Sequence, residues 1–153
     1  MKHLPLMLAL GLMLAASPAA GRKRQPAHQQ IPILAWYSIP PGVFATQEHY
    51  QELRDAGFTH SFSHTYKYDD AIQALDLCAK VGLKCVFMCS ELEKEPEATA
   101  RKVSRHPGLG AYFLRDEPGN DAMPDLGLWA RRIESVDKEH PCYLNLLPEH
   151  AFP

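Results

Sequence analysis

The sequence predicts an α/β fold with a parallel sheet, because short apolar segments alternate with segments of helical periodicity. Apolar segments begin near residues 33, 58, 83, 110 and 141, which gives a repeat of about 25 to 30 residues. Each repeat holds one strand and one helix, and this alternation predicts parallel strands joined by right-handed crossovers. The phrases Arg-Asp-Ala-Gly-Phe at 54–58 and Ala-Lys-Val-Gly-Leu at 79–83 occupy equivalent helix-to-strand junctions, which supports the repeat.

The first two units are bounded by residues with strong local preferences. After an apolar strand at 33–38 and a proline-rich turn, a helix is expected from near Thr46, and Gly57 lies where a C-terminal cap belongs. The second strand is expected at 58–63. The helix that follows opens near Asp69 or Asp70 and closes at Gly82, with Ile72, Leu75, Cys78 and Ala79 on one face.

The remaining units follow the same pattern less regularly. The third strand, at 83–88, is nearly all apolar, and the charged segment 93–105 is expected to form one helix. The fourth strand begins at Gly110 and ends before Pro118. A helix at about 124–138 turns Leu126, Trp129, Ala130 and Ile133 inward, and the fifth strand is expected at 141–146.

Two architectures share this pattern. The length of 153 residues suits a five-stranded doubly wound sheet, whereas a (β/α)8 barrel needs about 250 residues. However, the first strand-to-helix turn has no glycine-rich phosphate loop, and no helix follows the fifth strand. Reactive residues also fall at the C-terminal ends of several strands, as in a barrel active site; they are Trp36 to Ser38, His64 to Tyr66, Ser90, Glu91, Asp116, Glu117 and Asn145. We therefore favour the first five units of a (β/α)8 barrel, with the doubly wound sheet as the alternative.

The N-terminus predicts export. Lys2 and His3 precede an apolar run at 4–16 and then small residues, which is the layout of a cleavable signal peptide. We expect a signal peptide at 1–21, a flexible basic leader at 22–30 and the folded domain at 31–153. The mature protein is expected to be secreted or periplasmic and to have no membrane segment after cleavage.

Composition argues against several classes of partner and cofactor. A formal charge of −2 gives no strong attraction to nucleic acid. His60 and His64 on one strand would lie about 13 Å apart, too far to share a metal ion, and no metal or cofactor is expected. Cys85 and Cys89 are likewise too far apart to bridge, so buried free thiols are favoured over disulfides.

The segment 110–119 carries the main candidate chemistry. Its apolar residues end at Leu114 and give way to Arg115, Asp116 and Glu117, as when a buried strand surfaces at a reactive end. Two adjacent carboxylates beside a guanidinium can provide one proton donor with a shifted pKa, Asp116 raising the pKa of Glu117 and Arg115 lowering it. The alternative is a solvated turn with a surface ion pair.

Residues 115–118, Arg-Asp-Glu-Pro, resemble the strand-four signature of the clan A retaining glycoside hydrolases, and 31–153 looks like the front half of secreted (β/α)8 glycosidases. The resemblance implies hydrolysis of O-glycosidic bonds in an oligo- or polysaccharide, with Glu117 as general acid/base. Asp116 replaces the clan's asparagine, which contacts the sugar 2-hydroxyl. The family's nucleophile lies on strand seven, so we expect this chain to be an inactive fragment that lacks it.

Further contacts to the sugar are expected from three strand ends. Trp36 is a candidate stacking platform; because strand neighbours point oppositely, only one of Trp36 and Tyr37 should face the site. His64 and Asn145 are candidates for binding hydroxyl groups.

The alternative function is a non-catalytic carbohydrate-binding or scaffold protein. Open edge strands would also make the isolated fragment self-associate.

Overall fold

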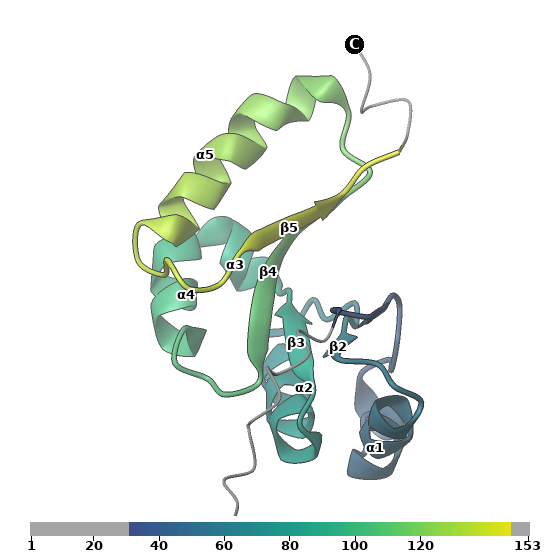
Figure 1. Ribbon diagram of the computed structural model, residues 1–153. Coiled ribbons are helices and arrows are strands. Elements are labelled where there is room, and N and C mark those ends of the chain that lie inside the picture. Colours follow the sequence, from purple (N-terminus) through teal and green to yellow (C-terminus); the bar gives the residue numbers. More distant parts are fainter. Residues whose placement is uncertain (1–30, 148–153) are drawn as a thin grey trace, which may run out of the picture. The chain divides into compact units, whose positions relative to one another are not determined.

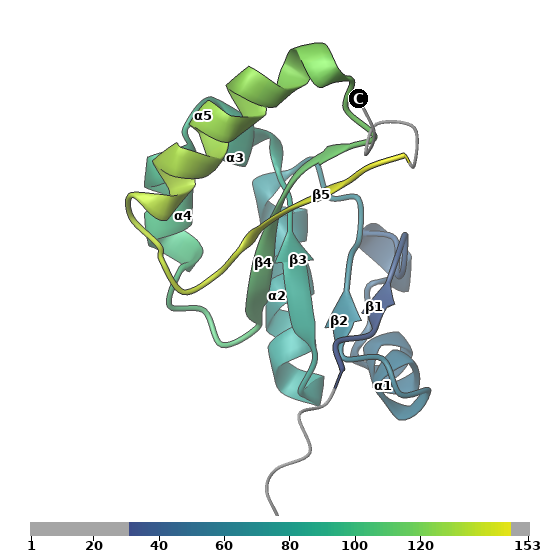
Figure 2. The same cartoon turned by 45° about the horizontal axis from the view of Figure 1, so that its top comes forward.

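The computed structural model describes residues 31–147, whose central feature is a parallel sheet of five strands. The strands are β1 (Leu34–Ala35), β2 (His60–Ser61), β3 (Lys84–Phe87), β4 (Leu109–Asp116) and β5 (Cys142–Asn145). They lie side by side in chain order, and the sheet curls like half of a barrel (Figures 1 and 2). A doubly wound sheet needs a point where the strand order reverses. This order has none, so the doubly wound alternative is wrong.

Local chemistry explains where the helices begin and end. They are α1 (Gln47–Asp55), α2 (Tyr68–Val81), α3 (Ser90–Lys94), α4 (Pro96–Val103) and α5 (Met123–Glu134), with short 3-10 turns η1 (Gly42–Phe44) and η2 (Asn120–Ala122). The helix α1 begins near Thr46 as expected, and the Thr46 side chain caps it by accepting a hydrogen bond from the His49 N–H. Gly82 ends α2 with φ of 77°, a left-handed conformation that glycine adopts without strain.

Several expected boundaries are corrected, and the second strand, expected at 58–63, is regular only at His60–Ser61. The segment 93–105 is not one helix, because Glu95 leaves helical geometry before Pro96, which opens α4. The regular part of β1 ends at Ala35, because Tyr37 takes a positive φ. The last helix ends at Glu134, and the turn that follows is organised by Asp137.

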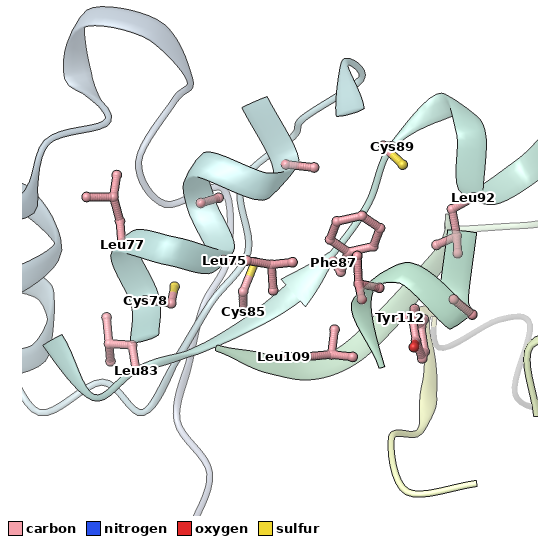
Figure 3. Close-up of a cluster of buried hydrophobic side chains, with 14 of the residues drawn as sticks. Leu75, Leu77, Cys78, Leu83, Cys85, Phe87, Cys89, Leu92, Leu109 and Tyr112 are labelled. Carbon is pink, nitrogen blue, oxygen red and sulfur yellow. The ribbon is translucent and has the colours of Figure 1, made fainter. Parts of the chain in front are cut away.

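The main hydrophobic core lies between the sheet and the helices (Figure 3). Leu75 of α2 lies toward Phe87 of β3 and Leu109 of β4 there, whereas Leu77 lies on the other side of α2. All four cysteines are free thiols; Cys78, Cys85 and Cys89 are buried, and Cys142 is half-buried.

The other face of the sheet carries a smaller cluster. Phe62, Val86, Ala111 and Phe113 are buried there. Half-buried Leu34, Trp36, Met88 and Tyr143 pack against them. Within residues 31–147 this cluster draws only on strands and strand ends, whereas every long helix contributes to the first core. One-sided helix cover is a second difference from a doubly wound sheet, in which helices cover both faces.

The outer strands β1 and β5 each have a single strand partner among the described residues. Self-association through these edges therefore stays a prediction.

The expected signal peptide and leader at 1–30 lie outside the described residues. Between residues 31 and 147, no helix is long and apolar enough to cross a bilayer.

A buried carboxylate fixes the turn between α5 and β5. Asp137 is 4% exposed, and its Oδ2 accepts hydrogen bonds from the Tyr112 hydroxyl at 2.7 Å and from His140 Nδ1 at 2.8 Å. Its Oδ1 accepts from the backbone N–H groups of Glu139 and His140. Burial opposes ionisation, but the hydrogen bonds from Tyr112, Glu139 and His140 outweigh it and lower the pKa of Asp137.

Asp137→Ala is expected to reduce the free energy of unfolding by about 2 to 4 kcal/mol near pH 7, because the Tyr112 hydroxyl loses its buried acceptor. A lowered folded-state pKa contributes stability above the unfolded-state value of about 3.9, and that contribution is lost as the pH falls through the folded-state pKa. The stabilities of the wild type and the variant should therefore converge in acid. Urea unfolding from pH 7 to pH 2 measures both effects, and a difference that does not change with pH would contradict this role of the carboxylate.

Candidate functional site

The ends of β4 and β5 bring three of the predicted site residues together. The Asn145 side chain donates from Nδ2 to Asp116 Oδ1 at 2.9 Å, and the Glu117 N–H donates to the Asn145 carbonyl at 2.8 Å. Asp116 and Asn145 are also partners in the register of the two strands. The two candidate carboxylates and the candidate hydroxyl-binding amide thus share one edge of the sheet, at the C-terminal ends of the strands.

A bulge in β4 decides which way the charged residues point. Phe113 pairs with Tyr143 and Asp116 pairs with Asn145, so three steps along β4 match two along β5. Such a bulge re-aims the side chains that follow it. In a regular strand, Arg115 would occupy this position on the sheet face. The bulge places Asp116 there instead.

Arg115 lies next to the two carboxylates in the sequence but forms its ion pair elsewhere. Its guanidinium lies 3.3 Å from Glu93 and lines a pocket with Leu126 and Trp129 of α5, on the helix-covered side. Arg115 therefore forms its ion pair with Glu93 of α3 and not with Asp116 or Glu117. The cause is the bulge, which a pattern of alternating residues does not reveal.

Two residues at this edge have strained backbones. Glu117 has φ of 45° and Tyr37 has φ of 48°, and they are the non-glycine residues with positive φ between residues 31 and 147. A non-glycine residue in the left-handed region costs about 1 to 3 kcal/mol, and such residues gather at functional sites. In this conformation the Glu117 side chain is exposed to solvent beyond the end of β4.

The positive φ of Tyr37 also decides how the rings of Trp36 and Tyr37 lie. Their rings contact each other edge to face, 5.7 Å between centroids, and both contact Phe62. Strand alternation fails because Tyr37 has left the extended conformation. Trp36 is half-buried among Phe62, Phe113 and Tyr143, so it supports the site from below. Tyr37, 56% exposed, presents the aromatic surface instead.

His64 lies at the end of the second strand segment inside an aromatic enclosure. Its ring stacks on Tyr37 with 3.9 Å between centroids and meets Phe62 and Phe113 on other sides. Its Nε2 is buried and has no hydrogen-bond partner among the described residues. An unpaired buried polar atom costs about 1 to 3 kcal/mol. Burial lowers the pKa of His64, while the Asp116 carboxylate partly opposes this, so the imidazole is neutral at physiological pH.

Tyr37 also lies within the field of the two carboxylates. The pKa of the Tyr37 hydroxyl is raised, first by partial burial and then by the negative charges of Asp116 and Glu117. The phenol therefore keeps its proton at neutral pH. Tyr66, whose ring lies 6.3 Å from that of His64, adds a second exposed aromatic residue. The sequence indicates both tyrosines only by their position at strand ends.

A pocket of about 280 Å³ opens beside the stacked rings. It is lined by Tyr37, His64, Ser38, Ser63 and the loop 39–41. The Ser38 hydroxyl lies 2.6 Å from that of Ser61 and 3.3 Å from that of Ser63, so these side chains hold the first loop against β2. Hydroxyl contacts of Ser38 therefore hold part of the pocket lining in place.

Chemically, this edge offers carboxylates that can transfer protons, an amide, a neutral imidazole and exposed aromatic rings. Among residues 31–147, no group of three or more His, Cys, Asp or Glu side chains is placed to hold a metal ion. Comparisons of the chain with protein families, curated proteins and solved structures gave no match.

Proposed function

We propose that this chain is a glycoside hydrolase-like protein in which Glu117 is the general acid/base for cleavage of O-glycosidic bonds. The observation that carries the proposal is the Asp116–Glu117 pair at the C-terminal end of β4, tied to Asn145 in a sheet of parallel strands in chain order. Catalytic residues of (β/α)8 barrels come from the C-terminal ends of different strands. We further propose that the five units are the first five of such a barrel and that the protein is exported.

The neighbours of Glu117 fit a sugar-binding role. Asn145 holds Asp116 in place through Nδ2, and its amide and the free carboxylate oxygen can bind hydroxyl groups. The exposed Tyr37 ring offers an apolar face for the C–H side of a sugar, backed by Trp36. His64 is the third proposed contact. The ligand is an oligo- or polysaccharide, and no cofactor takes part.

The mechanism needs two carboxyl groups. In a retaining enzyme the acid/base protonates the leaving oxygen while a second carboxylate, about 5 Å away, attacks the anomeric carbon; the first group then deprotonates the incoming water. The resemblance to clan A places this nucleophile on a later strand. We therefore propose that hydrolysis belongs to the product of the complete reading frame and that the 153 residues supply the acid/base and part of the sugar site.

A second candidate is a carbohydrate-binding protein without catalysis. The exposed rings of Tyr37 and Tyr66 and the Asp116–Asn145 pair are sufficient for binding and need no nucleophile. The two candidate functions differ in one observable: a glycoside hydrolase cleaves the bound sugar, and a binding protein does not.

A screen with cellotetraose, xylotetraose, mannotetraose and N-acetylchitotetraose tests both. Binding is followed by tryptophan fluorescence, since Trp36 lies under Tyr37, and cleavage by the appearance of reducing ends. The proposal expects cleavage of at least one probe by the complete gene product, with retention of anomeric configuration by NMR. Binding without cleavage favours the second candidate, and neither binding nor cleavage contradicts both.

A further inference from the structure

Two unfavourable features meet at the contact between Tyr37 and His64. Tyr37 is held at φ of 48°, and the ring that it stacks on has a buried, unpartnered Nε2. Tyr37 and His64 both lie beyond the regular parts of β1 and β2. The second unfavourable feature would disappear if the Tyr37 ring moved away and a polar group reached Nε2.

The aromatic rings around His64 differ in how easily they can move away from it. Phe62 and Phe113 are buried in the cluster on the open face of the sheet and cannot leave without exposing that cluster. Tyr37 is largely exposed and belongs to a turn, and the pocket of about 280 Å³ borders both Tyr37 and His64. The Tyr37 ring is therefore the part of the enclosure that can move at the lowest cost.

We propose that Tyr37 is a gate over His64: a ligand displaces the Tyr37 ring, enters the adjoining pocket and forms a hydrogen bond with His64 Nε2. A neutral imidazole nitrogen can donate or accept according to its tautomer, which suits a hydroxyl group. After displacement, the Tyr37 ring packs against the bound ligand. The gate rests on the contacts of this chain, whereas the choice of a sugar as the ligand rests on the proposed function.

The first test needs no ligand. His64 is titrated by NMR in the full chain of the wild type, Tyr37→Phe and Tyr37→Gly. Glycine adopts positive φ freely, so Tyr37→Gly keeps the turn and removes the cover. Its His64 pKa is expected to rise toward the ordinary value of about 6.5 as water reaches Nε2, although Asp116 also acts on this ring. Tyr37→Phe, which keeps the ring, should titrate like the wild type.

Two results would overturn the gate at this stage. One is a His64 pKa in Tyr37→Gly equal to that of the wild type, which would mean that other groups bury Nε2. The other is a pKa raised equally in Tyr37→Phe, which would assign the effect to the hydroxyl. Tyr37→Asn, which also tolerates the left-handed region, replaces Tyr37→Gly if the glycine variant does not fold.

The second test uses the four tetrasaccharides in stopped-flow fluorescence. Tyr37→Gly should increase both the association and the dissociation rate constants about tenfold, because the ring no longer blocks entry or packs on the bound ligand. His64→Phe should weaken binding about tenfold without changing the association rate constant. Unchanged rate constants in Tyr37→Gly would overturn the gate. If no tetrasaccharide binds, the proposed function fails, and the His64 titration alone decides whether Tyr37 is a gate.

Discussion

Replacing Glu117 with glutamine is expected to reduce kcat/KM of the complete gene product on natural oligosaccharides by at least about 100-fold, the usual range for loss of a general acid. Glutamine keeps the shape of the side chain, and the Glu117 N–H bond to the Asn145 carbonyl does not involve it. The loss should therefore come from the missing proton and leave the fold unchanged. Aryl glycosides with activated leaving groups need less protonation, so their glycosylation step should be much less affected.

The adjacent carboxylate provides a matched control. Asp116→Asn removes the same charge one residue away and can keep the Asn145 contact through its amide oxygen. It also restores the asparagine of the clan that 115–118 resemble, so most of the activity should remain. Steady-state kinetics on both substrate types compare the variants. An active Glu117→Gln beside an inactive Asp116→Asn would move the acid role to Asp116, and full activity in both would remove this pair from the mechanism.

The sequence predicted the parts of the fold that depend on local chemistry. Thr46 and Gly82 mark helix ends through a side-chain cap and a left-handed backbone, which are properties of single residues. The repeat of strand and helix was sufficient to predict parallel strands. It could not choose between a doubly wound sheet and consecutive barrel-like units, because strand order depends on long-range pairing.

The candidate site was harder to predict because two of its features are not local. The bulge that turns Asp116 toward Asn145 and Arg115 toward Glu93 arises from the pairing of β4 with β5. The positive φ of Tyr37, which places it beside Trp36, has no marker in the sequence, since a bulky residue is unusual in that conformation. The sequence thus placed Asp116, Glu117 and Asn145 at one edge but chose Trp36 where Tyr37 is the exposed ring.

The start of β4 is expected to tolerate substitution far less than its reactive end. Gly108 is buried against α2, and a Cβ added there would clash with the Leu75 carbonyl oxygen and lie 3.2 Å from the Ala79 nitrogen. These are backbone atoms of a helix and cannot move aside like a flexible side chain. The Gly108 carbonyl also accepts from the Cys85 N–H at 2.6 Å, so shifting Gly108 disturbs the first bond between β3 and β4.

We therefore expect Gly108→Ala to reduce the free energy of unfolding by about 3 kcal/mol or more, at the upper end of the range for overpacked cores. Gly127→Ala is the control for the same chemical change. It lies within α5, its added Cβ would meet only the end of the Arg131 side chain at 3.5 Å, and alanine favours a helix over glycine by about 1 kcal/mol. Urea unfolding followed by circular dichroism should give opposite signs for the two variants. A Gly108→Ala variant as stable as the wild type would show that α2 does not pack closely on the start of β4, the strand that ends at Asp116 and Glu117.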